Sequence, residues 1–433
     1  FSLTLGDAEP GSSRYLAPGS KYYVLVMVET RGGEVFISPA QSVTTPPSTS
    51  WTYYETEKDS KGIGYGYITD GVWKLYAERK AKGATNLKVT GSGGRFYGNI
   101  PSPMNFTSVK DETGACYKVV TLGAITFRDV HKFLYDQRAM LSEVIAPDCT
   151  EFEDNTGCIF NSCSSLTNVV LSAEFNKFLW RSFSYCYNLQ SFSPRRLSSS
   201  VPGQLFYQCY KLSEKFEFDS CSQIGDSAFY QCGELEEIVA PNATSVQASS
   251  FYGCKKLKKV VLSPQIVQIG SSAFSGCSSL ESDFVNQIAG RELKYFGSTD
   301  FTKMGSEFSG CSSLTSLVWN FANLATNVVN ASCFSGCSSL EKVIFKKPVV
   351  EIRSNAFYGI KPGAEVYMHK EAPAVFGGCA VARYCDGSAY PRIYLSGNED
   401  AWLDAMRQNH HVILKDDFDN KSYVSTVPVS CGH

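Results

Sequence analysis

The chain is poor in the residues that carry most catalytic and nucleic-acid chemistry. Of its 433 residues only five are His, and 40 Lys and Arg nearly balance 42 Asp and Glu, for a net charge of −2. This balance excludes the basic surface of a nucleic-acid-binding protein and the acidic tail of a solvating segment. No apolar run approaches the ~20 residues that a membrane span needs, so we expect no transmembrane segment.

The motifs of common catalytic and cofactor sites are also missing. The sequence contains no His-Glu-x-x-His and no Gly-x-Ser-x-Gly. Gly62–Gly66 and Gly91–Gly94 lack the later glycine of a dinucleotide site and predict turns. Asp417–Asn420 lacks the Gly and final Glu of a calcium loop, and His410-His411 indicates an exposed helix end. We therefore predict no catalytic residue, metal or cofactor. Carboxylate pairs for glycoside hydrolysis stay an open alternative, although the sequence indicates no pocket for them.

What the chain has instead is cysteine at a fixed period. Eight of its 16 Cys stand in the frame Phe-x-x-Cys-x-x-Leu, with successive spacings of 23, 23, 23, 22, 23, 34 and 26 residues. Weaker copies at Tyr135 and Phe357 flank the series. Such periodicity predicts a solenoid with atypical capping ends. The eight are Cys163, Cys186, Cys209, Cys232, Cys254, Cys277, Cys311 and Cys337.

A strand signal follows most of these frames. Apolar residues recur at 0, +3 and +5 from the Leu, as in Leu235, Ile238 and Ala240. This spacing predicts one short strand per ~23-residue coil, and the strands would stack into a parallel sheet. Two copies depart from the pattern. Phe216 and Phe218 follow Leu212 one residue later than the +3 and +5 positions of the pattern. Between Cys277 and Cys311 there are 11 more residues than in a 23-residue coil.

The full frame resembles a known family. Ile-Gly-x-x-Ala-Phe-x-x-Cys-x-x-Leu at 224–235 and its copy at 269–280 resemble the BspA-type leucine-rich repeat family over about residues 130–395. The resemblance implies a leucine-rich repeat solenoid. It also implies a bacterial surface or secreted protein that mediates protein binding or adhesion rather than catalysis.

The segments outside the repeats predict further modules. Leu16–Val26 resembles a corner of fibronectin type III domains, which implies that residues 1–48 form the last strands of such a sandwich and that earlier residues are missing. A two-stranded extension is the alternative. The chain begins without an initiator Met or apolar leader, so we expect any export signal to have been removed.

The remaining boundaries follow from the same patterns. We expect a small β-rich module at 49–126, with strands near 72–76, 86–90 and 117–122, and the solenoid at 127–361. A capping region at 362–433 would contain strands at 365–368 and 393–395 and a helix begun by Asn398.

The repeat cysteines predict packing rather than chemistry. Ligands of one metal must converge, whereas stacked coils hold equivalent side chains ~4.8 Å apart, too far for the ~3.8 Å between disulfide Cβ atoms. We therefore interpret the eight as small buried hydrophobes. Outside the frame, Cys149 with Cys158 and Cys379 with Cys385 are open candidates for disulfides in an oxidising compartment.

Strand positions +1, +2 and +4 should face outward, where they make two patterns. Glu236-Glu237, Lys258-Lys259 and Glu281-Ser282 predict an acid–base–acid ladder on three strands, which either supports register or recognises a ligand. Position +4 is β-branched, which reflects either strand propensity or an apolar row for a partner. These +4 residues are Val170, Val239, Val261, Val318 and Ile344.

Our hypothesis is a monomeric protein whose sheet face binds a protein or host-matrix ligand. The alternative is a glycan-binding accessory protein, for which turn tyrosines should cluster on an exposed edge. They are Tyr185, Tyr187, Tyr207, Tyr210, Tyr230 and Tyr252.

Overall fold

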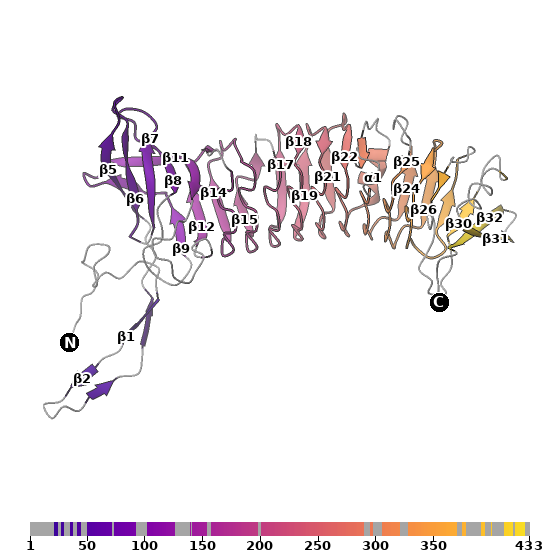
Figure 1. The fold of residues 1–433 in the computed structure, drawn as a ribbon, viewed down its shortest axis with the longest axis horizontal. Coiled ribbons are helices and arrows are strands. Elements are labelled where there is room, and N and C mark those ends of the chain that lie inside the picture. The colour runs from indigo at the N-terminus through magenta and orange to yellow at the C-terminus, as the bar shows by residue number, and fades with distance from the viewer. Residues whose placement is uncertain are drawn as a thin grey trace. The chain divides into compact units, whose positions relative to one another are not determined.

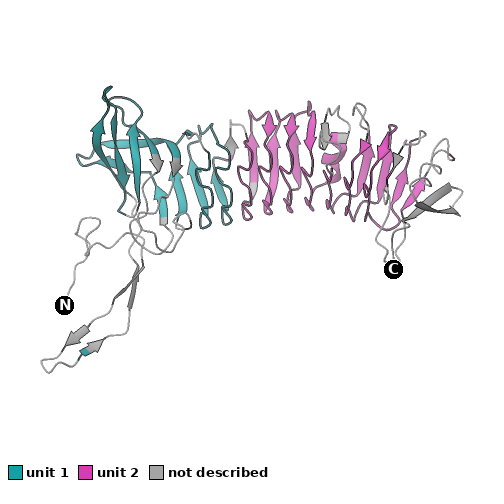
Figure 2. Ribbon diagram, viewed as in Figure 1, with its two compact units in different colours: residues 1–194 teal, residues 195–433 magenta. Residues whose placement is uncertain are grey.

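The structure of the protein is a computed structural model that divides into two compact units, residues 1–194 and 195–433 (Figure 2). It describes residues 21–24, 27–29, 35–37, 41–44, 50–71, 73–91, 102–125, 139, 141–153, 157–197, 201–289, 295–297, 305–320, 328–369, 375–377, 391–394, 400, 411–418 and 421–428.

The first unit begins with two antiparallel pairings. Strand β1 (Lys21–Val24) pairs with β4 (Gln41–Thr44), and β2 (Met27–Glu29) pairs with β3 (Val35–Ile37). The segment therefore contains paired strands, as both the sandwich and the two-stranded extension predict. The pairings by themselves do not establish a fibronectin type III sandwich.

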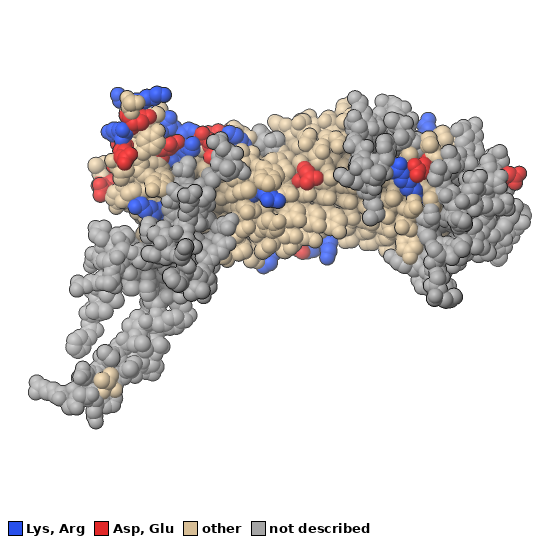
Figure 3. All heavy atoms as spheres, viewed as in Figure 1, with Lys and Arg blue, Asp and Glu red and all other residues tan. Residues whose placement is uncertain are grey.

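A seven-stranded sheet follows, in the order β10-β5-β6-β7-β8-β11-β13 (Figure 1). Its strands are β5 (Trp51–Lys58), β6 (Gly64–Thr69), β7 (Lys74–Arg79), β8 (Asn86–Gly91), β10 (Val109–Asp111), β11 (Cys116–Ile125) and β13 (Glu151–Phe152). The strands predicted near 72–76, 86–90 and 117–122 correspond to β7, β8 and β11. Trp51, Trp73 and Leu75 are fully buried, so this module has a core of its own. Figure 3 shows Lys, Arg, Asp and Glu gathered together on its surface.

The first coils of the repeat also belong to this unit. They form a parallel sheet ordered β15-β14-β12-β9. Its strands are β9 (Ser102–Asn105), β12 (Leu141–Ala146), β14 (Asn168–Leu171) and β15 (Ser191–Ser193). Strand β9 comes from the predicted β-rich module, whereas β13 comes from the predicted solenoid and joins the module's sheet. The two segments therefore exchange a strand and share their cores.

The second unit stacks the later coils with their strands in parallel rows (Figure 1). One row is ordered β16-β17-β19-β21, and its strands are β16 (Arg196–Leu197), β17 (Glu214–Phe218), β19 (Leu235–Ala240) and β21 (Lys259–Leu262). A second row is ordered β18-β20-β22-β23, with β18 (Gln223–Ile224), β20 (Ser245–Val246), β22 (Gln268–Gly270) and β23 (Tyr295–Gly297). The prediction of one strand per coil was thus incomplete, because the Ile-Gly part of the frame is also extended and buries Ile224 and Ile269.

Further coils continue both rows towards the C-terminus. The six-stranded sheet contains β24 (Ser316–Trp319), β26 (Lys342–Phe345), β28 (Glu365–Tyr367), β30 (Arg392–Tyr394), β32 (Lys421–Pro428) and β31 (His411–Phe418), in that order. The three-stranded sheet contains β25 (Val328–Val329), β27 (Glu351–Ile352) and β29 (Val375–Phe376). Strands β28 and β30 confirm the predicted terminal strands. His411 begins β31, whereas His410 lies outside the described residues, so the expected helix end stays a prediction. Asp400 is helical, in agreement with the helix predicted to begin at Asn398, and the rest of that helix lies outside the described residues, as does the Cys379 and Cys385 pair.

The Phe and Cys of the frame form the centre of each coil. In the second unit, rings of successive coils stack from Phe206 to Phe357 with centroids 5.3 to 5.6 Å apart. The Cys thiols are fully buried, and that of Cys254 donates a hydrogen bond to the carbonyl of Phe229 in the preceding coil at 3.1 Å. Cys149 and Cys158 are free thiols, so the structure does not form that candidate disulfide. The predicted burial is confirmed, and the same kind of thiol bond recurs in other coils, where the thiol is a second donor to a carbonyl that also accepts a backbone N–H.

The 34-residue coil contains the helix α1 (Ser282–Ala289) where a strand was expected. Its buried Phe284, Val285 and Ile288 share one face, which packs on the core. Ser282 Oγ accepts a hydrogen bond from the backbone N–H of Thr315 at 2.9 Å, and Asn286 Oδ1 accepts one from that of Val318 at 2.8 Å. These side chains accept hydrogen bonds from the backbone N–H groups just before and within β24. A neighbouring strand would otherwise accept them. Glu281-Ser282 is therefore not a rung of the strand ladder.

Candidate interaction face

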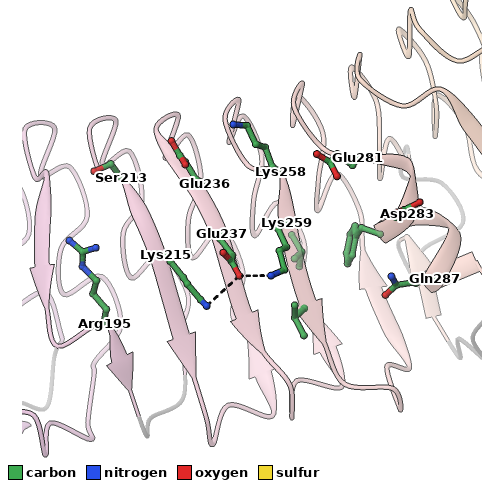
Figure 4. A pocket seen from close by; sticks show the side chains of 13 residues that line it. Arg195, Ser213, Lys215, Glu236, Glu237, Lys258, Lys259, Glu281, Asp283 and Gln287 are labelled. Atoms are coloured by element: carbon green, nitrogen blue, oxygen red, sulfur yellow. Dashed lines mark ion pairs between the residues drawn. The ribbon is translucent and has the colours of Figure 1, made fainter.

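The charged residues predicted on strands β19 and β21 lie together on the outer side of their sheet. Glu237 pairs in register with Lys215 on one neighbouring strand and with Lys259 on the other. Its Oε1 lies 3.4 Å from Lys215 Nζ and 3.0 Å from Lys259 Nζ (Figure 4). The rungs therefore run base–acid–base, and the expected acid–base–acid order was wrong at the third rung.

These ion pairs change the titration of Glu237. Burial opposes ionisation, but the ion pairs with Lys259 and Lys215 outweigh it and hold the pKa of this carboxyl below its ordinary value. Glu237 is thus ionised at neutral pH. Lys215 also contacts Glu217 Oε1 at 2.8 Å, so four charged side chains here fix one another's positions.

The departure of the frame after Leu212 explains how Lys215 reaches this ladder. Glu214 pairs with Leu235 and Lys215 with Glu237, which leaves Glu236 unopposed. Beyond this bulge in β19, Phe216 pairs with Ile238, and Phe216 and Phe218 point into the core although each stands one residue later than the frame places it. Lys215 consequently lies beside Glu237, and sequence reasoning missed it because the frame alone gave it a buried position.

An open hollow of about 850 Å³ extends along this face from Arg195 to α1. Lys215, Glu237 and Lys259 line its middle, and α1 borders its far end (Figure 4). Glu236, Lys258 and Glu281 are exposed, lie nearer the turns and form no ion pair with any residue that the structure describes. Helix α1 adds Asp283, Phe284 and Gln287. We call this surface the charged hollow.

The predicted apolar row is present in part. Val239 and Val261 are half-buried and directly paired on β19 and β21, and Val261 lines the charged hollow. Val318 and Ile344 are a second half-buried pair, on β24 and β26. Helix α1 packs against both β21 and β24 and separates these two pairs, and Val170, also half-buried, lies in the first unit.

Among the residues that the structure describes, no group of three or more His, Cys, Asp or Glu side chains is arranged to hold a metal ion. No helix in the same ranges is both long and apolar enough to cross a membrane.

Comparison with known proteins identifies the repeat. The BspA type leucine rich repeat region, a profile of six copies, matches residues 118–213, 199–306 and 302–372, which is more than half of the chain. The protein belongs to this family. No curated protein matches the BspA type chain significantly.

Several solved structures are similar to this BspA type protein at low identity. A leucine rich cell surface protein from Faecalibacterium prausnitzii is 14% identical, with 78% of this chain and 96% of that chain covered and a TM-score of 0.39. The leucine rich repeat protein of T. pallidum is 18% identical, with coverage of 56% and 98% and a TM-score of 0.37. One from Bacteroides ovatus is 18% identical, with coverage of 75% and 88% and a TM-score of 0.36.

Proposed function

We propose that the charged hollow of this BspA type protein binds a protein partner, and that the protein acts in adhesion at a bacterial surface rather than in catalysis. The observation that carries the proposal is the composition of the hollow. Four cationic and four acidic side chains line it, in alternating rungs. Such alternation favours a protein segment with complementary charges over a polyanion, because any uniform charge would meet repulsion at every second rung.

The hollow also offers apolar area to such a partner. Val261 lines it beside its half-buried neighbour Val239, and Phe284 contributes part of its wall. Specific interfaces combine an apolar centre with a polar rim. The face supplies both, with Glu236 and Lys258 at the edge nearer the turns.

The finer parts of the proposal concern the setting. Membership of the BspA type family supports a protein located outside the cell or on its surface, with a host-matrix protein as the partner. Residues 1–48 would be the end of a fibronectin type III sandwich that links the repeats to a preceding segment. A structure of a longer chain, with or without such a sandwich, tests this last point.

The binding test uses purified collagen, laminin and fibronectin on a sensor surface. We expect the protein to bind at least one of them, and the double variant Val239→Thr/Val261→Thr to bind about tenfold more weakly, since two apolar contacts would be lost. Val350→Thr is the matched control, because Val350 is 54% exposed and lies outside the hollow.

A second variant tests the charges. Lys259→Glu reverses one rung and should abolish binding while circular dichroism stays unchanged. If neither the double Thr variant nor the charge reversal alters binding, the charged hollow is not the binding site.

A further inference from the structure

A second surface of the second unit, on the turns between the sheet rows, has a different chemistry. Tyr207, Tyr230 and Tyr252 follow the Phe of three successive coils. Their rings stack almost parallel, with centroids 4.7 and 4.8 Å apart and interplanar angles of 10° and 7°. This tyrosine ladder brings together three of the six turn tyrosines for which a glycan-binding role predicts a cluster on an exposed edge, and the three are half-buried.

The ladder ends abruptly at Tyr252. The backbone N–H of Gln231 bonds to the carbonyl of Tyr252, and in the next step the N–H of Gly253 bonds to that of Ser275. Ser275 thus holds the equivalent place in the following coil. Its short side chain cannot continue the stack, so the ring face of Tyr252 that points away from Tyr230 has no aromatic partner among the described residues.

A hollow of about 660 Å³ adjoins this end of the ladder. Gly253 and Gly276 line it beside Tyr252, and a Cβ at Gly276 would lie only 3.4 Å from Gly253 Cα. Both glycines have positive φ, which makes a larger residue unfavourable at either position. The absence of side chains at these two positions keeps the space beside Tyr252 open.

Two polar residues of this hollow, Gln231 and Lys255, can bind a ligand as a hydrogen-bond donor and a cation. Gln231 Oε1 accepts a hydrogen bond from Gln208 Nε2 at 3.1 Å, so Gln231 Nε2 can donate to a ligand. Glu234 and Lys256 form an ion pair and neutralise each other. Lys255 is exposed and forms no ion pair with any described residue.

We propose that Tyr252, Gln231 and Lys255 form a binding site for an acidic sugar, a pyranose that carries a carboxylate. The C–H face of the sugar ring would stack on the open face of Tyr252, as apolar ring surfaces do on aromatic side chains. Gln231 Nε2 would donate to a ring hydroxyl, and Lys255 would bind the carboxylate. This site is separate from the charged hollow and does not depend on the protein-binding proposal.

The test measures binding of defined saccharides to the purified full chain by isothermal titration calorimetry. Two acidic probes separate the possible sources: 3′-sialyllactose represents host glycans, and trigalacturonic acid represents uronic-acid polysaccharides. Lactose is the neutral comparison. We expect one acidic probe to bind, and lactose to bind at least about tenfold more weakly.

The variants follow from the repeat itself. Tyr252→Ser introduces the residue that the next coil has at this position, so the variant should fold normally, yet it should bind the acidic probe about tenfold more weakly. Lys255→Gln should reduce the affinity for the acidic probe to a similar extent. The matched controls Tyr76→Ser, an exposed tyrosine of the first unit, and Lys259→Gln, in the charged hollow, should leave sugar affinity unchanged.

The outcomes are distinct. The proposal is overturned if neither acidic probe binds, if lactose binds equally well, or if either Tyr252→Ser or Lys255→Gln keeps full affinity. Because Lys259→Glu abolishes only the expected matrix-protein binding, failure of that function and failure of the sugar site give different results.

Discussion

Glu307 places a carboxyl group in the interior of the second unit. It directly precedes Phe308 of the frame, a position that Ala228 and Ala273 hold in other coils, and it is fully buried. Asn330 Nδ2 donates to its Oε1 at 2.9 Å, whereas Oε2 has no hydrogen-bond partner among the described residues. A buried carboxylate with one unsatisfied oxygen is costly, so the neutral form is favoured.

The size of the effect follows from its titration. Burial raises the pKa of Glu307 from 4.5 to about 7, although its own backbone N–H, Cys333, Asn330 and the charge of Arg353 favour the ionised form. The folded protein therefore keeps a proton that the unfolded chain releases near pH 4.5. The stability that this proton contributes is complete below pH 4.5 and is lost as pH rises to 7. The loss amounts to about 3 kcal/mol in total, of which roughly 2–3 kcal/mol falls between pH 5 and pH 8.

The variant Glu307→Gln removes this dependence while keeping the side-chain volume. We expect the difference in unfolding free energy between variant and wild type to shift in favour of the variant by roughly 2–3 kcal/mol from pH 5 to pH 8. Urea unfolding at both pH values measures it, and any pH-independent cost of the amide cancels in the comparison. Glu281→Gln, at an exposed position, should show no such shift. A difference for Glu307→Gln that stays constant with pH would refute the reasoning.

Three smaller predictions use other features of the structure. In the folded protein, iodoacetamide should alkylate the exposed Cys116 and leave Cys254 unreacted. Burial makes the Cys254 thiol inaccessible to the reagent and raises its pKa, and mass spectrometry of the digested protein measures the alkylation of each residue. Asn286→Ala removes the acceptor of the Val318 amide, so it should lower the free energy of unfolding by about 1–2 kcal/mol. Hydrogen exchange should become faster at the Val318 amide but not at distant amides. Glu237→Gln should destabilise by at most about 1 kcal/mol at low salt. That difference should disappear in high salt and as pH falls through the lowered pKa of Glu237.

The regular part of the fold was predictable because one frame recurs. Each frame contributes a buried Phe, a buried Cys and a Leu, and outside the 34-residue coil that Leu precedes a strand, so the copies determine the coil length and the parallel strands. The hydrogen bonds from repeat thiols to carbonyls were not predictable from burial alone, since Ala would be equally small. These carbonyls also accept a backbone N–H, as Phe229 does from Cys232, so the thiol is a second donor to them.

The candidate site was predictable only where the frame holds. Glu237 and Lys259 follow the frame and lie on the predicted face. Lys215 does not, because an extra residue after Leu212 shifts its strand by one residue relative to the frame. Glu281 is not on a strand, contrary to the prediction, because the chain after Leu280 forms a helix. A short apolar pattern such as Phe284, Val285 and Ile288 does not distinguish a helix from a strand unless the element that it packs against is known.

The two departures from the repeat are related by position. The extra residue after Leu212 brings Lys215 onto the outer face in the charged hollow, and the long coil after Leu280 contributes α1 at its far end. Between them lie two regular coils that carry Glu237 and Lys259. A uniform stack of identical coils would present the same surface at every step along the solenoid. The charged hollow thus includes a regular pair of coils with an irregular coil on each side. The same reasoning applies to the tyrosine ladder, where the change from Tyr252 to Ser275 leaves a ring face open. In this solenoid the conserved frame supplies the scaffold, and the candidate binding sites arise where successive coils differ.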